Sequence, residues 1–183
     1  MKRIILLSMV LTISFCAFAQ NEVSKKENNP LDISRELEKI AEYGVPTIQI
    51  VEQMKAKADT LYNSNSWADA IVAYEEFAKK ANWLANLLSQ CVEPYYSASY
   101  DDKKNISYSV LKKYAPYEKA SNDYKKLRNE AYVKIGLCHK QLGHIDKAVV
   151  YLYKGLDLVN VDEGIDWSLA VDALSEIIGF KAE

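Results

Sequence analysis

Cys138, His139 and His144 are the side chains in this sequence whose types and spacing could support catalysis or metal binding. A Cys beside a His can form a nucleophilic pair, and Cys and His together are common zinc ligands. Cys138 and His139 are adjacent, however, and adjacent residues on a helix point in different directions. No fourth ligand is evident. We therefore expect no catalytic residue, no metal site and no cofactor here.

The usual catalytic and nucleotide-binding motifs do not occur in the sequence. There is no phosphate-binding P-loop, no G-x-S-x-G, no H-E-x-x-H and no C-x2-C. Asp and Glu residues are plentiful but scattered over polar helix faces, which gives no carboxylate pair arranged for glycoside hydrolysis. These observations favour a protein that is not an enzyme.

Gly and Pro are scarce, and this scarcity indicates the fold class. Six Gly and four Pro make ten of 183 residues, whereas the average content is about 12%. An all-β fold would need a turn about every 8–12 residues, so we expect an all-α chain. The 23 Lys and Arg and 25 Asp and Glu are mixed in sign. They give no basic field for nucleic acid and no polybasic strip for anionic lipid.

Residues 1–19 have the features of a bacterial secretory signal peptide. Two basic residues precede an apolar run over residues 4–15, and Ala17-Phe18-Ala19 supplies the small residues of a cleavage site, between Ala19 and Gln20. The run is shorter than the roughly 20 residues of a membrane span, and no later segment reaches that length without charges. We therefore expect an exported protein, periplasmic or secreted, without a transmembrane span in its mature chain.

The Cys residues raise two further questions. A lipid on Cys16 would anchor the protein to a membrane, but bacterial lipidation requires a small residue before the Cys, where Phe15 stands here. We therefore expect no lipid anchor. Cys91 and Cys138 could pair in an oxidising compartment. Both fall on apolar helical stripes, where free Cys is common, so we expect two buried thiols rather than a disulfide.

Apolar periodicity predicts a first helical hairpin after a flexible leader over residues 20–30. Apolar residues recur at intervals of three and four over residues 51–61 and again over 67–81. The polar turn between these stripes ends at Ser66, which can cap the second helix. We expect the whole of residues 31–183 to form one helical domain.

A second hairpin is predicted near the C-terminus. One stripe runs over residues 117–142, Gly143 ends it, and a returning stripe covers residues 145–159. A last helix is expected over residues 165–179. The middle, residues 82–115, predicts two helices with poorly defined bounds. Three prolines are expected near helix starts: Pro46, Pro94 and Pro116.

The two hairpins resemble the tetratricopeptide repeat (TPR), whose 34 residues follow the pattern W-x2-L-G-x2-Y, A-x3-F and P. In the second hairpin Tyr132 stands at the aromatic position and Ile135-Gly136 at the Leu-Gly pair. Ala148 and Leu152 fill the A-x3-F positions, whereas His139 and Asn160 replace the family's Tyr and Pro. In the first hairpin Ala58, Ala70 and Tyr74 take the Gly, Ala and Phe positions, and Met54 and Lys57 depart from the pattern.

The resemblance implies a short right-handed solenoid of stacked antiparallel hairpins, closed by a C-terminal capping helix. It is clearest over residues 51–84 and 129–162, and a degenerate repeat could lie in residues 85–128. Small residues would let the paired helices approach, and larger ones would fill the space around them. The residues expected to make this packing are Ala58, Ala70, Tyr74, Gly136, Ala148 and Leu152.

The resemblance also implies a concave groove lined by the first helices, where Lys and Asn of several TPR proteins clamp a peptide's C-terminal carboxylate. The corresponding face of the first hairpin carries Lys55, Asp59, Tyr62 and Asn63. Asp59 would repel a carboxylate, and the second hairpin has the apolar Val133 and Leu137 at the matching positions. This argues against a carboxylate clamp. Neighbouring helices or an apolar partner would cover that face, and we favour the helices.

Tyrosine is concentrated in the middle of the chain. Eight of the 13 Tyr lie between residues 95 and 132. Helix packing explains Tyr117, Tyr124 and Tyr132, with the phenols reaching the surface. Four others fall in the irregular segment and are candidates for a partner surface, since Tyr is enriched in interfaces: Tyr95, Tyr96, Tyr100 and Tyr108.

Together these features lead us to expect a non-enzymatic, exported TPR-like module of the bacterial envelope that binds or scaffolds a protein or peptide. A lipid-anchored assembly factor is one alternative. An enzyme or small-ligand binder with a helical pocket of unfamiliar type is another. The sequence does not identify the partner.

Overall fold

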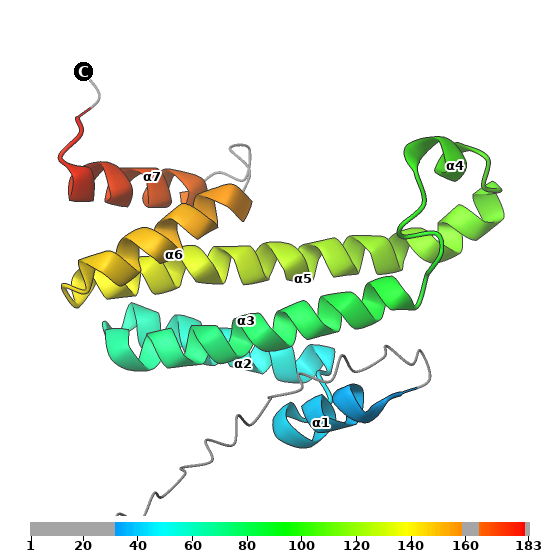
Figure 1. The fold of residues 1–183 in the computed structure, drawn as a ribbon, viewed down its shortest axis with the longest axis horizontal. Helices are drawn as coiled ribbons and strands as arrows, with labels where there is room; N and C mark the ends of the chain where they lie inside the picture. The colour runs from blue at the N-terminus through cyan, green and yellow to red at the C-terminus, as the bar shows by residue number, and fades with distance from the viewer. Residues whose placement is uncertain (1–31, 159–164, 182–183) are drawn as a thin grey trace, which may run out of the picture.

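A computed structural model describes residues 32–158 and 165–181, and every regular element in these ranges is an α-helix (Figure 1). The expected all-α class is therefore confirmed. The predicted signal peptide and leader lie outside the described residues. The helices in the described part are α1 (Ser34–Tyr43), α2 (Ile48–Asn63), α3 (Trp67–Gln90), α4 (Tyr100–Lys104), α5 (Tyr108–Gln141), α6 (Ile145–Leu158) and α7 (Ile165–Ile178).

The first hairpin consists of α2 and α3. Thr47 follows Pro46 and caps α2, because its hydroxyl accepts the Ile50 N–H at 3.2 Å. The turn before α3 ends at Ser66, as the sequence predicts. The expected side-chain cap is wrong, however, because the Ser66 hydroxyl makes no capping hydrogen bond. Its carbonyl instead accepts the Ala70 N–H at 2.8 Å, as the first bond of the helix.

The middle of the chain differs from the sequence prediction. α3 ends at Gln90, and Pro94 lies in a run of turns well before α4. Pro116 lies inside α5. Neither of these prolines marks a helix start, so both expectations are wrong. Residues 85–128 hold the end of α3, the short α4 and the first part of α5, and they contain no separate hairpin.

Tertiary contacts explain why α5 continues through Pro116. A Pro inside a helix removes one hydrogen bond and presses on the preceding turn. Here both sides of the proline are held by α4 and the turns before it. The ring of Tyr114 lies 5.3 Å from the ring of Tyr95, and Glu118 binds Lys103 at 2.8 Å. Figure 1 shows the first part of α5 set at an angle to the rest.

The larger core lies between α3 and its two neighbours, α2 and α5. Tyr74 and Phe77 are its largest fully buried side chains, and small residues such as Ala81 allow the helices to approach. Ser121 of α5 is also fully buried, and its hydroxyl donates to the Ala85 carbonyl of α3 at 2.8 Å. This bond satisfies a polar group that would otherwise be costly to bury.

A second core joins α5, α6 and α7. A Cβ placed on Gly136 of α5 would lie 2.7 Å from the Cγ atom of Leu152 on α6. A Cβ placed on Gly155 of α6 would lie 2.7 Å from Cγ2 of Val133. The two helices therefore approach closely at both glycines. Ala148 of α6 is fully buried beside this contact.

The α3–α5 pair has two different ends. Figure 1 shows α6 and α7 at one end and α4 at the other. We call residues 86–118, from the end of α3 through α4 to the first part of α5, the arm. α1 is set apart below the pair, and Ile33, Leu37 and Ile40 on its apolar face are exposed. Lys80 of α3 donates to the Gly44 carbonyl at the end of α1, at 3.1 Å. Within the described residues, every helix is too short or too polar to cross a membrane.

Candidate functional site

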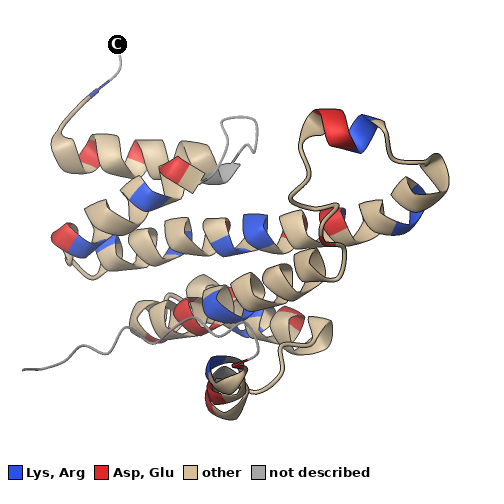
Figure 2. Cartoon of the chain, turned by 45° about the vertical axis from the view of Figure 1, so that its right-hand side comes forward, with Lys and Arg blue, Asp and Glu red and all other residues tan. Residues whose placement is uncertain are grey.

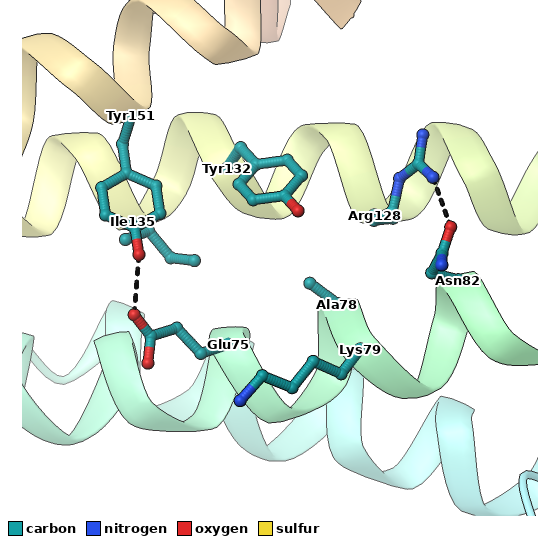
Figure 3. A pocket seen from close by; sticks show the side chains of 8 residues that line it. All are labelled: Glu75, Ala78, Lys79, Asn82, Arg128, Tyr132, Ile135 and Tyr151. Carbon is teal, nitrogen blue, oxygen red and sulfur yellow. Dashed lines mark hydrogen bonds between the residues drawn. The ribbon is translucent and has the colours of Figure 1, made fainter. Parts of the chain in front are cut away.

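A groove with polar and apolar lining lies where α3, α5 and α6 meet (Figure 3). Its volume is about 380 Å³. α3 contributes four residues spaced as one helix face, α5 contributes three, and α6 contributes one. They are Glu75, Ala78, Lys79 and Asn82, then Arg128, Tyr132 and Ile135, and finally Tyr151.

The floor of the groove is apolar and its rim is polar. Ala78 and Ile135 are buried, and the small side chain of Ala78 leaves the space open. The ring of Tyr132 stacks on Tyr151 at a centroid distance of 6.2 Å. Nζ of Lys154 lies over the Tyr132 ring, 5.3 Å from its centroid. The groove therefore has an aromatic wall beside a charged edge.

One end of the groove is closed by a hydrogen bond between α6 and α3. The Tyr151 hydroxyl donates to the Glu75 carboxylate at 2.8 Å (Figure 3). Burial, and then this bond to Glu75, raises the pKa of the Tyr151 phenol to about 12. Tyr151 is therefore protonated at neutral pH and holds Glu75 as an acceptor.

The other end holds Arg128, a half-buried guanidinium with amide partners only. Its Nε and Nη2 donate to Oδ1 of Asn129 at 3.0 and 2.8 Å, and its Nη1 donates to Oδ1 of Asn82. Asn129 is buried, and its own amide donates to the Leu158 carbonyl at 2.7 Å. These bonds fix the position of the guanidinium without neutralising its charge.

The groove carries an excess of positive charge although the whole chain has a net charge of −2. Lys79 is exposed on the rim and forms no ion pair with a described residue. Lys79 and Arg128 oppose the single carboxylate of Glu75, and Lys154 adds a third cation nearby. Elsewhere basic and acidic residues are interspersed over the helices (Figure 2).

Most residues of the predicted partner face of the first hairpin contact other residues of the same chain. Asp59 binds Lys55 at 2.7 Å and accepts the Tyr74 hydroxyl at 2.6 Å. Burial by itself would raise the pKa of the Asp59 carboxyl, but the bonds from Lys55 and Tyr74 outweigh burial and lower it. Tyr62 packs against Trp67 and Tyr74, with Lys134 over its ring at 4.7 Å. Asn63 is exposed at the end of α2.

The matching face of the second hairpin is covered by α7. Val133 is fully buried, and Leu137 packs against the same cluster, which includes Ala170 and Ala173 of α7. A neighbouring helix therefore covers this face, as the sequence favoured. Ala58, Ala70, Tyr74, Gly136, Ala148 and Leu152 are all buried between helices.

The structure separates the four candidate tyrosines into two kinds. Tyr95 is only 7% exposed and donates to Glu118 at 2.9 Å. Tyr96 is half-buried and accepts from Lys125 at 2.7 Å. The expectation of a partner surface at Tyr95 is wrong, because its ring fills the base of the arm. Tyr100 and Tyr108 are 75% and 79% exposed.

Of the tyrosines expected to pack, Tyr124 is buried and Tyr132 lines the groove. Tyr117 is 43% exposed on the arm, so more than half of its surface is covered while part of it reaches solvent.

Cys138 and His139 are both buried but lie in different environments. Cys138 belongs to the larger core, where burial raises the pKa of its thiol to about 11. A thiol with this pKa is a poor nucleophile at neutral pH. Burial lowers the pKa of the His139 imidazole, and so do the charges of Lys147 and His144. Nδ1 of His139 has no hydrogen-bond partner among the described residues.

Cys91 is exposed, so the expectation of two buried thiols is wrong for it, and both thiols are free. Cys91 follows the last residue of α3, where the chain leaves the core. Among the described residues, no three His, Cys, Asp or Glu side chains are grouped to hold a metal ion.

Sequence reasoning missed the groove, although two signals pointed to it. Glu75, Lys79 and Asn82 repeat at helical spacing in the middle of a strongly apolar helix. Arg128 is the only Arg after residue 35, and Arg is preferred over Lys where a planar group must be oriented by several hydrogen bonds. Comparison with family models, with curated protein sequences and with solved structures finds no match for this chain.

Proposed function

We propose that this protein is a non-enzymatic, exported interaction module of the bacterial envelope, and that the groove between α3, α5 and α6 holds a segment of a protein partner. The observation that carries the proposal is the groove itself. It combines an apolar floor, aromatic walls and a charged rim, with its polar groups fixed by hydrogen bonds. This is the composition of a recognition surface, in which aromatic and Arg side chains dominate binding.

The helices supply a rigid support for such a groove. α2, α3, α5, α6 and α7 pack in chain order, apart from the short α4. This order supports a TPR-like stack. α5 alone has 34 residues, however, the length of a whole repeat of about 34 residues. We therefore propose a short TPR-like stack near α6 and α7 that is extended by the arm.

Affinity purification from an envelope extract tests the proposal. The bait is the mature protein with a C-terminal tag, compared with a groove variant, Lys79→Ala/Tyr132→Ala. The matched control is Tyr100→Ala/Tyr108→Ala, which removes two exposed rings from the arm. We expect the groove variant to lose a partner that the wild type and the arm variant retain. All three baits should unfold at similar urea concentrations, so that lost binding is not lost folding.

Retention of the same partners by the groove variant would refute the proposal. Loss in the arm variant alone would place the interaction at Tyr100 and Tyr108 and would also refute the groove. The intact mass of the exported protein tests its expected processing. A chain that starts at Gln20 without added lipid is the expected result, and a lipid-bearing chain that starts at Cys16 would favour the anchored alternative.

A further inference from the structure

We propose that the groove recognises acidic side chains, Asp or Glu, within an extended segment of the partner, and that Arg128 takes the carboxylate with two parallel hydrogen bonds. This inference rests on the proposed function and adds the chemistry of the ligand. It differs from a clamp for a chain terminus in its place and in its residues. The groove lies on α3, α5 and α6, away from the face of Lys55 and Asp59.

Two N–H donors of Arg128 remain available for a ligand after its hydrogen bonds within the protein are counted. A guanidinium has five N–H donors, one on Nε and two on each terminal nitrogen. Three are used: those from Nε and Nη2 to Asn129, and that from Nη1 to Asn82. One N–H therefore remains on Nη1 and one on Nη2. A carboxylate is the planar acceptor that takes two such donors at once.

The hydrogen-bond partners of Arg128 leave its positive charge without a counter-ion. Its three bonds go to neutral amide oxygens, and it forms no ion pair with a described carboxylate. The one carboxylate of the groove, Glu75, accepts the Tyr151 hydroxyl. The charge of Arg128 is thus held in position, partly removed from water and uncompensated. An incoming carboxylate would provide the missing compensation.

The remaining groups favour a side chain of an extended segment over a small anion. Lys79 lies on the α3 side of the rim, and Nζ of Lys154 on α6 lies 5.3 Å from the Tyr132 ring centroid. A segment with several acidic residues could reach more than one of these cations. The apolar floor at Ala78 and Ile135 would accept the methylene groups of Glu.

The test uses a dye-labelled hexaglutamate peptide, amidated at its C-terminus, and measures its binding to the mature protein by fluorescence anisotropy. Hexaglutamine is the uncharged probe. We expect hexaglutamate to bind at least about tenfold more tightly, because its carboxylates add an ionic attraction to Arg128 and Lys79 that neutral amides lack. Equal binding of the two peptides would overturn the inference. Hexaglutamate with a free C-terminus should bind within about twofold of the amide, and a tenfold preference for it would also overturn the inference.

Three single variants test whether hexaglutamate binds in the groove. Arg128→Lys keeps the charge but loses the two-donor fork, and we expect about tenfold weaker binding. Because Arg128 also supports Asn129, Lys79→Met provides a variant at an exposed position, with an expected loss of about threefold or more. The matched control is Lys112→Met, an equal charge change on the exposed arm. Equal losses in Lys79→Met and Lys112→Met would show non-specific attraction and refute the assignment.

The two proposals can fail separately. If the groove variant loses its envelope partner but hexaglutamate binds no better than hexaglutamine, the groove is an interaction site with a different chemistry. If the groove variant keeps its partner, the proposed function fails, whatever the peptides do.

Discussion

Gly136→Ala is the substitution that measures how closely α5 and α6 pack. Gly136 lies in the interior of α5, where Ala would normally stabilise the helix by about 1 kcal/mol. The added Cβ, however, would lie 2.7 Å from Cγ and 3.0 Å from the backbone nitrogen of Leu152. The side chain of Leu152 can rotate away, but its backbone can move only if α6 shifts. The substitution therefore has two opposite effects on the free energy of unfolding: higher helix propensity raises it, and the steric clash with Leu152 lowers it.

The tertiary cost should prevail. Overpacking a close-packed interior costs about 1–3 kcal/mol, and a backbone contact belongs at the upper end of this range. After the helix-propensity gain, we expect the free energy of unfolding to fall by about 1–2 kcal/mol. Gly155→Ala is the matched comparison. Its Cβ would lie 2.7 Å from Cγ2 of Val133, but the nearest backbone atom is at 3.4 Å. We therefore expect a smaller loss, about 0–1 kcal/mol.

Urea unfolding followed by far-UV circular dichroism gives the free energies. Two double variants separate side-chain from backbone crowding. Adding Val133→Ala should make Gly155→Ala neutral or stabilising, because the side-chain atom in conflict is gone. Adding Leu152→Ala should leave Gly136→Ala destabilising, because the backbone contact remains. If Gly136→Ala is as stable as the wild type or more stable, the close approach of α5 and α6 is refuted.

Three further predictions concern buried polar and sulfur groups. Tyr74→Phe removes the 2.6 Å bond to Asp59, and urea unfolding should show a loss of about 1–2 kcal/mol; no loss would contradict a contribution of this bond. His139 has a lowered pKa in the folded protein, so as pH falls its imidazole is protonated in the unfolded state before it is protonated in the folded state. Its contribution to stability should be present above the unfolded pKa of about 6.5 and lost as pH falls through the lower folded value. His139→Gln should flatten this dependence, and an unchanged slope between pH 5 and 7 (roughly the window set by that pKa) would exclude His139 as its source. In thiol labelling of the chain that starts at Gln20, with a disulfide reagent, Cys91→Ser should abolish the fast reaction and Cys138→Ser should not, because Cys91 is exposed and Cys138 is buried.

The helical hairpins could be predicted because their signals are local. The apolar stripe of α3 follows from helical spacing, and the small residues Gly136 and Ala148 follow from the resemblance to the TPR pattern. The structure buries all of these positions between helices. α7 lies almost where the final stripe placed it. In each case the residues that determine the element lie within one or two turns of each other.

The middle of the chain could not be predicted because tertiary contacts override its local signals. Pro116 marks a helix start by propensity, yet α5 continues through it. The contacts of Tyr114 with Tyr95 and of Glu118 with Lys103 hold the helix on both sides of the proline. Tyr95 lies in a segment without regular structure and is nevertheless buried. Turns in proteins usually lie at the surface, which made Tyr95 a candidate for a partner surface. Tyr95 is buried because the turns after α3 pack against the first part of α5, where Tyr95 contacts Tyr114 and Glu118.

The groove was missed because a small residue between helices has two possible consequences. At Gly136 the missing side chain lets α5 and α6 approach until Leu152 fills the space. At Ala78 the small side chain instead leaves a hollow, because Arg128 and Tyr132 line the opposite side without filling it. The sequence pattern is the same in both cases, an apolar small residue on a buried stripe. Which outcome follows depends on how far apart the two backbones are held, and here that spacing turns a packing position into the floor of a candidate binding site.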